Sequence, residues 1–596
     1  MVPKTETVNP ALVVRRVRLW HSLIILIIAI FGLRLFYVQV IRYDHYKTAA
    51  LSDQLKQYEI PASRGIIKAH NGDVVVPIVL NQKLYTLFAD PVHIKEKDVN
   101  KYAGEVAKLI GGQPGDYTEK LKKENTRYVI LGKKLNEEQH KKVVALELPG
   151  LGTDEQLYRT YPQQQLAAQL LGFVNNDGEG KYGVEQALNK ELTGKAGQLK
   201  AITDVRGVPL AASKDNIQNP AQPGKDITLT IDLAMQAQLE KILQQQAQKT
   251  RSELLSAVII DPNSGQIKAM ANYPTYNPAK MNEVDDPSVF QNAVVSHAIE
   301  PGSIIKPLTT AAALDQGVIN PNTSWYDPAR ITVNGYTITN IEEDGGPRTQ
   351  NVASTLALSL NTGVTWELMQ MGGGQINTKA ITAWHEYMTA RYLFGAKTGV
   401  EQGYEGAGYI PPANPKKPAI ALTYANSSFG QGMTVTAMQA AAALSAVVNG
   451  GTYYQPTLVD QLTSGDGTVT KQKPKVVKQG IVSEKTSKAM IPLMEQVVTH
   501  YRDSGFAYLR FSDRYMVGGK TGTAQIAQPG GGYSDHDFNG TYMGFVGGDH
   551  PEYVIAVFNN KPKVAGYAGS RAGQPVFADL AHMLINNGFV TPKTGQ

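Results

Sequence analysis

The stretch GGKTGTAQ (residues 518–525) lies in a strand-like run, YMVGGKTGTAQIA, and contains the tripeptide Lys-Thr-Gly. Lys520 and the hydroxyls of Thr521 and Thr523 can together hold a carboxylate. The glycines of the stretch, which let another chain approach the backbone closely, are Gly518, Gly519 and Gly522. An edge strand of this kind can pair with an extended peptide, and one of its N–H groups can point into an oxyanion hole. The stretch therefore predicts one wall of a peptide-binding site.

The same tripeptide occurs twice more, in FGAKTGVEQ (394–402) and in PKTGQ (592–596). Lys397 follows a run that ends near Gly395 and whose apolar residues fall on one helical face, so we expect this copy in the loop after a helix. The residues of that face are Ile381, Trp384, Met388 and Tyr392. Lys593 lies in the last residues of the printed sequence, where we expect the least order. Only Lys520 fits a catalytic strand.

A candidate nucleophile lies in EPGSIIKPLTTAAALDQGVI (300–319), a predicted helix that begins after Pro-Gly and ends near Gly317. Ser303 falls in its first turn, where free N–H groups and the helix dipole favour a developing anion. Lys306 lies three residues later on the same face, and a lysine whose pKa is lowered by burial can take the proton of a serine. The alternative is a helix cap beside a solvated lysine, which is the usual meaning of Ser-x-x-Lys. This Ser-x-x-Lys is nevertheless the only one in the sequence.

A partner for the proton is present in ALSLNTGV (357–364), which holds the only Ser-x-Asn of the sequence, Ser359 and Asn361. The Ser359 hydroxyl can pass a proton to a leaving amine, and the Asn361 amide can hydrogen-bond both a lysine and a substrate carbonyl. Taken alone, the segment is better explained as the end of a helix followed by a turn.

Ser-x-x-Lys, Ser-x-Asn and Lys-Thr-Gly on a late strand, in this order, are the motif set of penicillin-binding proteins and serine β-lactamases. The chain resembles a class B penicillin-binding protein, a monofunctional peptidoglycan D,D-transpeptidase of the division or elongation type. The resemblance covers nearly the whole length and includes ASRGIIKAHNG (62–72), LLGFVNNDGEGKYGVEQALNKELTGKAG (170–197), LTIDLAMQAQLE (229–240), FGQGMTVTAMQ (429–439) and NGGTYYQP (449–456). Departures from the family pattern are Ile304-Ile305, Leu360 and Lys68-Ala69.

The resemblance implies a mechanism. Ser303 attacks the penultimate D-Ala carbonyl of a stem pentapeptide with neutral Lys306 as base, and an amine of a neighbouring stem then takes the acyl group. The N–H groups of Ser303 and Thr523 form the oxyanion hole. The implied catalytic residues are Ser303, Lys306, Ser359, Asn361 and Lys520, and the implied substrate-binding residues are Thr521, Gly522 and Thr523. β-Lactams would acylate Ser303 as substrate mimics.

The order of the predicted elements indicates an α+β fold. SAVIIDPNSGQIKAMA (256–271) is a predicted hairpin, the stretch from about 300 to 450 is rich in predicted helices, and three strand-like runs follow near the end. We therefore expect a sheet assembled from distant segments. The resemblance adds an extended mixed α/β pedestal domain before a serine β-lactamase-like transpeptidase domain, whose central antiparallel sheet is flanked by helices.

The sequence also predicts where the domains begin and end. SKDNIQNPAQPGKD (213–226) is polar, contains Pro and Gly and has no periodicity, so it predicts a linker. We expect a cytoplasmic tail at 1–18, a transmembrane helix at 19–41, a pedestal or dimerisation-like domain at 42–213, a linker at 214–225, a transpeptidase domain at 226–590 and a tail at 591–596.

The segment LWHSLIILIIAIFGLRLFYVQVI (19–41) is long enough to cross a bilayer, and three arginines, Arg15, Arg16 and Arg18, precede it. The positive-inside rule then places the N-terminus in the cytoplasm and the rest of the chain outside it. Two alternatives are a cleaved signal peptide, although no small residues follow the apolar core, and a buried soluble helix, because Arg34 interrupts the run. An arginine near the end of a span can, however, reach the interface.

The amino-acid composition and the net charge exclude several kinds of site and partner. Among the 596 residues, 42% are hydrophobic and 18% charged, which suits a folded protein, and cysteine is absent, which excludes disulfides and Cys-based metal sites. The net charge of +6 is spread along the chain and gives little support for nucleic-acid binding. SDHD (534–537) is interpreted as a polar surface loop, and no Gly-rich phosphate loop follows a strand. We predict no metal, no cofactor and no nucleic-acid partner.

The partners implied by the resemblance are stem peptides ending in D-Ala-D-Ala, β-lactams, a membrane glycosyltransferase and proteins of the division or elongation machinery. A β-lactamase or β-lactam sensor shares the motifs but lacks a pedestal like residues 55–200, and a class A protein needs a glycosyltransferase domain after the anchor. A non-catalytic membrane scaffold remains the alternative of a different class. The lack of extra insertions favours division over elongation.

Overall fold

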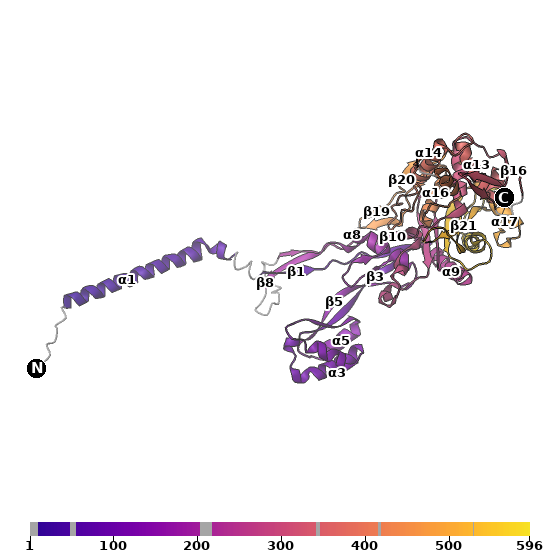
Figure 1. Cartoon of the computed structure of the whole chain (residues 1–596). Coiled ribbons are helices and arrows are strands. Elements are labelled where there is room, and N and C mark those ends of the chain that lie inside the picture. Colours follow the sequence, from indigo (N-terminus) through magenta and orange to yellow (C-terminus); the bar gives the residue numbers. More distant parts are fainter. Residues whose placement is uncertain are drawn as a thin grey trace. The chain divides into compact units, whose positions relative to one another are not determined.

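The structure, a computed structural model, describes residues 10–47, 55–202, 217–340, 346–414, 416, 419–528 and 530–595. The chain divides into two units (Figure 1). The smaller unit comprises residues 1–62 and 194–223, and the larger comprises residues 63–193 and 224–596.

The smaller unit begins with the long helix α1 (Pro10–Phe36), which continues into a π-helical turn, η1 (Tyr37–Ile41), drawn in indigo in Figure 1. Residues 17–41 contain an 18-residue window with a mean hydropathy of 2.5, and none of this window is buried by protein. By length and composition, the helix meets the requirement for a membrane span. Residues 1–9 of the predicted tail lie outside the described residues.

A three-stranded antiparallel sheet completes the described part of this unit. Its strands, in spatial order, are β1 (Leu55–Ile60), β8 (Gly197–Ile202) and β9 (Ile217–Asn219). The predicted linker at 214–225 therefore contains a strand, because residues 217–219 pair with β8, while residues 214–216 lie outside the described residues. A polar composition hid this strand, since its partner β8 is supplied from another part of the sequence.

The larger unit contains a mixed sheet that joins early and late segments of the chain. Its path is β19 (Val469–Lys471), β18 (Val459–Thr463), β10 (Asp226–Asp232), β2 (Ile67–Asn71), β3 (Val74–Ala89) and β4 (Val129–Leu135), with β5 (Leu151–Thr160) also paired to β3. The hairpin of β2 and β3 turns at Gly72, whose φ of 61° suits glycine. β10 pairs with β2 in parallel, so a strand at the start of the predicted transpeptidase domain shares a sheet with the predicted pedestal. The exact boundary between them stays a prediction.

The far half of β3 carries a small α/β lobe (Figure 1). Three helices pack there, α3 (Val99–Ile110), α4 (Pro114–Leu121) and α5 (Glu137–Ala145), together with the short turns η2 (Pro91–His93) and η3 (Glu96–Asp98). They enclose a separate core that includes Leu87, Val106 and Leu131. The helix predicted from EEQHKKVVALEL is α5, and Asn136 caps it by accepting a hydrogen bond from the Gln139 N–H.

The main sheet of the larger unit has five antiparallel strands. Their order is β12 (Ile267–Tyr273), β11 (Leu254–Ile260), β23 (Pro551–Asn560), β22 (Tyr533–Gly547) and β21 (Met516–Ala527). The predicted hairpin at 256–271 is confirmed as β11 and β12, and the last three strands come from the end of the chain. The sheet is therefore assembled from distant segments, and β21 lies at its edge.

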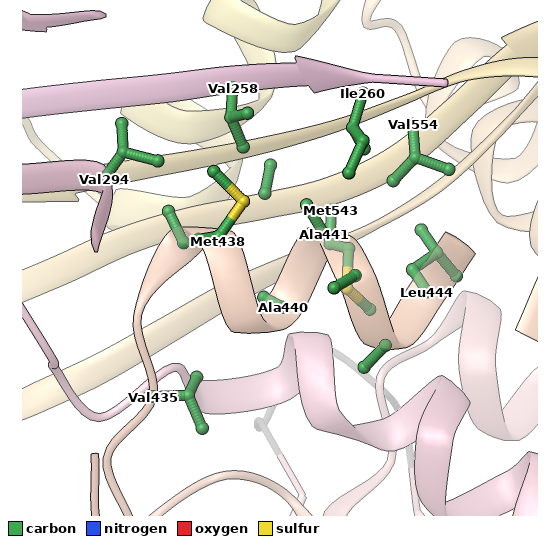
Figure 2. Packing of buried hydrophobic residues seen from close by; sticks show 14 of the residues in the cluster. Val258, Ile260, Val294, Val435, Met438, Ala440, Ala441, Leu444, Met543 and Val554 are labelled. Atoms are coloured by element: carbon green, nitrogen blue, oxygen red, sulfur yellow. The ribbon is translucent and has the colours of Figure 1, made fainter. Parts of the chain in front are cut away.

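Both faces of this sheet are covered by helices, which explains why β11 is apolar on both faces except at Ser256. One face packs against α9 (Leu233–Thr250) and α18 (Gln574–Asn586). The other packs against α16 (Ala437–Val448), in which every residue is buried. In Figure 2, Met438, Ala441 and Leu444 of α16 point toward Val258 and Ile260 of β11 and toward Val554 of β23.

The remaining elements surround this core. They are α6 (Ala168–Leu171), β6 (Phe173–Val174), β7 (Gly180–Lys181), α7 (Gly183–Ala187), α8 (Asn189–Thr193), η4 (Pro278–Glu283), η5 (Pro287–Phe290), α10 (Ala293–Ser296), η6 (Gly302–Ile305), α11 (Lys306–Asp315), β13 (Ser324–Asp327), β14 (Arg330–Val333), β15 (Tyr336–Thr339), β16 (Arg348–Asn351), α12 (Val352–Ala357), α13 (Asn361–Met371), α14 (Thr378–Glu386), η8 (Tyr387–Arg391), α15 (Ile420–Ser428), β17 (Thr452–Tyr454), β20 (Val476–Gln479), α17 (Glu484–Asp503), η9 (Ala507–Leu509) and η10 (Gly569–Gly573).

The predicted helix-rich stretch from about 300 to 450 is confirmed by α11 to α16, and it also contains four short strands, β13 to β16, in two small sheets. Two expectations from the sequence were wrong. SDHD (534–537) belongs to the exposed end of β22 rather than to a loop. The C-terminal tail is held by hydrogen bonds, because the Lys593 N–H donates to Arg514 O at 2.8 Å and the Thr594 hydroxyl donates to Asp549 at 2.6 Å.

Candidate active site

Ser303 lies in η6, the turn that leads into α11, and is half-buried. The turn is packed backbone to backbone against the edge strand β21, since a Cβ at Gly302 would lie 2.6 Å from Thr523 O. Gly302 also has a φ of 63°, so glycine is required there on two counts. The Thr541 hydroxyl of β22 donates to Pro301 O at 2.6 Å, which fixes the entry to the turn. Ser303 is thereby held beside Thr523.

Lys306 begins α11, and its side chain is completely buried. Its Nζ donates to Ser359 Oγ at 3.1 Å and to Asn361 Oδ1 at 2.8 Å, and it also donates to the backbone O of Ser359. The predicted contact between the first two motifs is therefore present. A buried amine needs such acceptors, because an unpaired one would be expensive to desolvate.

Ser359 and Asn361 occupy the junction between α12 and α13. The predicted helix ends with α12 at Ala357, and Asn361 is the first residue of the next helix. Ser359 has a φ of 57°, an unusual conformation for a serine that turns its backbone O and hydroxyl toward the same amine. The Asn361 Nδ2 donates to Thr339 O at 3.0 Å, which leaves Oδ1 facing Lys306.

Lys520 is completely buried on β21, and its Nζ donates to Thr521 O at 3.1 Å and to Thr521 Oγ1 at 3.2 Å. The hydroxyl of Thr521 lies 3.1 Å from the hydroxyl of Tyr501, on α17. Thr523 Oγ1 accepts a hydrogen bond from the Gly569 N–H at 2.9 Å. The third motif therefore forms the wall that the sequence predicted.

The glycines of this strand have a different purpose from the one we expected. A Cβ at Gly518 would lie 2.3 Å from the ring of Phe545, and one at Gly519 would lie 2.5 Å from the ring of Tyr542. Gly522 is closed in by Pro301 O, 2.5 Å from its Cβ position. The space is filled by the protein's own residues, so these glycines seat the strand rather than admit a ligand chain.

The three motifs open onto one cleft of about 730 Å³. Its lining residues are Ser303, Ala357, Leu358, Ser359, Asn361, Phe429, Gln431, His500, Tyr501, Ser504, Phe506, Thr521, Thr523, Gln525, Phe538, Gly566, Tyr567, Ser570 and Arg571. The departures Ile304, Ile305 and Leu360 are completely buried and do not line it, so they alter core packing instead. Within the described ranges, no three His, Asp or Glu side chains lie close enough together to hold a metal ion.

The comparisons with known proteins agree with this geometry. The family described as "Penicillin binding protein transpeptidase domain" matches residues 255–582, which is more than half of the chain. The chain belongs to the penicillin-binding protein family. A second match, "Penicillin-binding Protein dimerisation domain", covers residues 59–229, so this penicillin-binding protein has the class B order of a dimerisation domain followed by a transpeptidase domain.

Relatives resemble this penicillin-binding protein along most of their length. Stage V sporulation protein D of Bacillus subtilis is 30% identical over 580 residues, covering 96% of this chain and 85% of that protein. Peptidoglycan D,D-transpeptidase FtsI of Escherichia coli is 26% identical over 587 residues, covering 97% and 92%. The crystal structure of Penicillin Binding Protein 2X from Streptococcus thermophilus superposes with a TM-score of 0.71 at 23% identity, covering 90% of this chain and 80% of that one, which shows the shared fold.

Sequence reasoning did not find several cleft residues. Tyr501, Phe506 and Arg571 come from α17, from the loop after it and from η10, none of which carries a motif. No local sequence pattern marks these residues. They reach the cleft only because segments that are far apart in the sequence pack together in the folded protein. The copy of the tripeptide at Lys397 is exposed in the loop after η8, as predicted.

The sequence analysis also did not single out a buried acidic residue, Glu367. Glu367 of α13 is completely buried, and its Oε2 accepts a hydrogen bond from the Thr310 hydroxyl of α11 at 2.8 Å. Burial raises the pKa of Glu367 to about 8, although the Thr310 hydrogen bond and the charge of Lys306 act in the opposite direction. The side chain is therefore largely protonated at pH 7.

Replacing this acid should change how stability depends on pH. Between its ordinary pKa of 4.5 and its folded pKa of about 8, Glu367 keeps a proton that the unfolded chain releases, so the free energy of unfolding falls as pH rises. In the wild type, we expect Glu367 to lower the free energy of unfolding by about 3–5 kcal/mol between pH 5 and pH 8. Glu367→Gln, which keeps an acceptor for Thr310, should remove this decrease. Denaturant unfolding at both pH values measures this difference, and equal pH slopes in the two proteins would contradict it.

Proposed function

We propose that this penicillin-binding protein is a peptidoglycan D,D-transpeptidase that crosslinks stem peptides through an acyl-enzyme at Ser303 and is acylated there by β-lactams. The observation that carries the proposal is the meeting of three distant motifs at one cleft. Lys306 contacts Ser359 and Asn361, while Ser303 lies beside Thr523 of the Lys-Thr-Gly strand. The name of the FtsI relative supports the same activity.

In the proposed acylation step, the Ser303 oxygen attacks the carbonyl carbon of the penultimate D-Ala, and its proton passes to the neutral amine of Lys306. A serine hydroxyl needs such a base to become an effective nucleophile. The N–H groups of Ser303 and Thr523 would stabilise the oxyanion. Support for this arrangement comes from the backbone contact between η6 and β21, which keeps both residues on the same side of the cleft.

The C–N bond to the terminal D-Ala then breaks, and the leaving amine takes a proton from Lys306 through the Ser359 hydroxyl. The contact of 3.1 Å between Lys306 Nζ and Ser359 Oγ supports this relay. Asn361, held by Thr339, positions Lys306 and the substrate carbonyl. Lys520, Thr521 and Thr523, with Gly522 between them, would hold the carboxylate of the departing D-Ala.

In the second step, an amine of a neighbouring stem peptide attacks the Ser303 ester. A crosslinking amide bond forms, the ester bond breaks, and the proton lost by the amine returns to Ser303. A β-lactam would follow the first step only, because its ring opens without releasing a leaving group. A membrane glycosyltransferase and the division machinery are the protein partners that we propose, and a fluorescent fusion that failed to collect at the septum would argue against the division role.

Removing the nucleophile provides the direct test. Ser303→Ala deletes one hydroxyl from a half-buried side chain, so we expect the fold to persist and covalent labelling by a fluorescent penicillin to disappear. The measurement is the fluorescent band after denaturing electrophoresis, with melting temperature as the control for folding. Labelling of Ser303→Ala at the wild-type rate would exclude the mechanism, and no labelling of the wild type would favour a non-catalytic scaffold.

The lysines of the three Lys-Thr-Gly copies should differ in their effect on acylation. Lys520→Ala removes a buried charge-assisted contact, typically worth roughly 2–4 kcal/mol in a transition state, so acylation by penicillin should slow by about two to three orders of magnitude. Lys397 is exposed, and Lys397→Ala should change the free energy of unfolding by no more than about 0.5 kcal/mol. Lys593→Ala should leave acylation unchanged, since the contact of Lys593 with Arg514 is a backbone hydrogen bond that alanine retains. Equal slowing in Lys397→Ala and Lys520→Ala would place the catalytic strand elsewhere.

We propose that α1 anchors the protein with its N-terminal side in the cytoplasm and the catalytic domain outside. The supports are the apolar stretch at residues 17–41 and the arginines that precede its apolar centre. Protease added to intact spheroplasts should digest the chain after residue 47 and leave the N-terminal tail protected. Digestion of the tail with protection of the catalytic domain would reverse the topology.

A further inference from the structure

The charges around the cleft are unbalanced. Among the described residues that line it, none carries a carboxylate, and Arg571 is the one lining residue with a permanent positive charge. The amines of Lys306 and Lys520 lie buried below the surface of the same site. A concave site that is lined by an arginine and by no acid favours an anionic ligand.

Arg571 belongs to η10, and η10 is packed directly on the Lys-Thr-Gly strand. The Gly569 N–H donates to Thr523 Oγ1 at 2.9 Å, and a Cβ at Gly569 would lie 2.4 Å from Gly522 O. Because the two backbones touch, the position of Arg571, two residues later, is fixed relative to Thr523.

A second series of contacts connects Arg571 with Thr521. The guanidinium lies 5.5 Å from the ring centroid of Phe506, and this ring packs edge-on against Tyr501 at 5.4 Å. The Tyr501 hydroxyl is in turn 3.1 Å from Thr521 Oγ1. Arg571 and the two threonines therefore belong to one continuous wall of the cleft.

The guanidinium itself is available to a ligand. The Arg571 side chain is exposed, and across the described part of the chain it has no ion-pair partner. The face of Phe506 restrains its plane without occupying its N–H donors. A planar guanidinium with free donors matches the geometry of a carboxylate, which it can bind through two parallel hydrogen bonds.

We propose that Arg571 binds the C-terminal carboxylate of the acyl donor, as a cationic addition to the hydroxyls of Thr521 and Thr523. This assignment rests on the proposed transpeptidase function. The place of Arg571 on the same wall of the cleft as Thr521 and Thr523 favours the terminal carboxylate over a carboxylate on a stem-peptide side chain, which would lie on the acyl side of the scissile bond. Arg571 is thus a substrate-binding residue, and it acts before the chemical step.

Two penicillins distinguish the two sources of a carboxylate. Benzylpenicillin carries only the ring carboxylate, which mimics the terminal carboxylate of the substrate, whereas carbenicillin carries an additional carboxylate on its side chain. The rate of acylation of the full chain is measured with both compounds over a range of concentrations, so that initial binding and the rate at saturation are obtained separately.

The variants are Arg571→Gln, Arg571→Lys and a matched control, Arg502→Gln. Arg502 contributes the same charge at the end of α17 but pairs with Asp503 and does not line the cleft. We expect Arg571→Gln to weaken initial binding of both penicillins by roughly 10- to 100-fold with little change in the rate at saturation. Arg571→Lys should restore part of the binding, which loss of packing against Phe506 alone would not explain, and Arg502→Gln should match the wild type.

Three results would overturn the assignment: unchanged binding in Arg571→Gln, an equal loss in Arg502→Gln, or a loss confined to carbenicillin. Failure of the proposed function is seen separately, in the wild type and in Ser303→Ala. If the wild type is not acylated, or if Ser303→Ala is acylated normally, the transpeptidase mechanism fails whatever the Arg571 variants do.

Discussion

The buried amine of Lys306 determines how the middle of the transpeptidase domain is arranged. An amine without access to water needs acceptors, and two side-chain acceptors of Lys306 come from the junction between α12 and α13. The position of that junction relative to α11 is therefore set by a polar contact inside the core. Asn361 extends the constraint to Thr339 of β15, so one buried group organises three segments. Loss of one of these acceptors would weaken the pairing of a buried amine, which is more costly than loss of an exposed contact.

Backbone contacts position the rest of the site. Gly302 packs on Thr523, and Gly430 packs on Gly302, where a Cβ would lie 2.0 Å from its carbonyl oxygen. Gly569 repeats the pattern on the other side of the strand, against Gly522. Main-chain atoms have fewer ways to rearrange than long side chains, so a site walled by such contacts is held in one geometry. This is the kind of rigidity that electrostatic stabilisation of a transition state requires.

The sequence predicted the positions of the three motifs better than it predicted their surroundings. Ser303, Lys306, Ser359, Asn361 and Lys520 could be placed because each belongs to a short motif whose spacing fixes its local geometry. The hairpin at 256–271 could be placed because two apolar runs flank a turn.

Other features depend on tertiary contacts that no local pattern contains. Glu367 is unremarkable on an isolated helix, and only the fold brings it to Thr310 and excludes water. Arg571 and Tyr501 meet in the cleft although they are far apart in the sequence. The strand glycines were misread because the neighbours that fill their space, Phe545 and Tyr542, lie on a partner strand. The four-residue strands β13 to β16 are too short and too polar to show the alternation of apolar and polar residues that indicates a strand.

The order of strands in the main sheet also limits how the chain can fold. β11 forms its pairs on one side with β12, which follows at once, and on the other with β23, which lies roughly 300 residues later. During synthesis, the open edge of β11 therefore waits for its partner strand until nearly the whole chain has been made. Strand β21, which carries the Lys-Thr-Gly motif of the cleft, joins the sheet through β22, which itself needs β23. The order of the sequence thus makes the working site one of the last parts of the protein that can form.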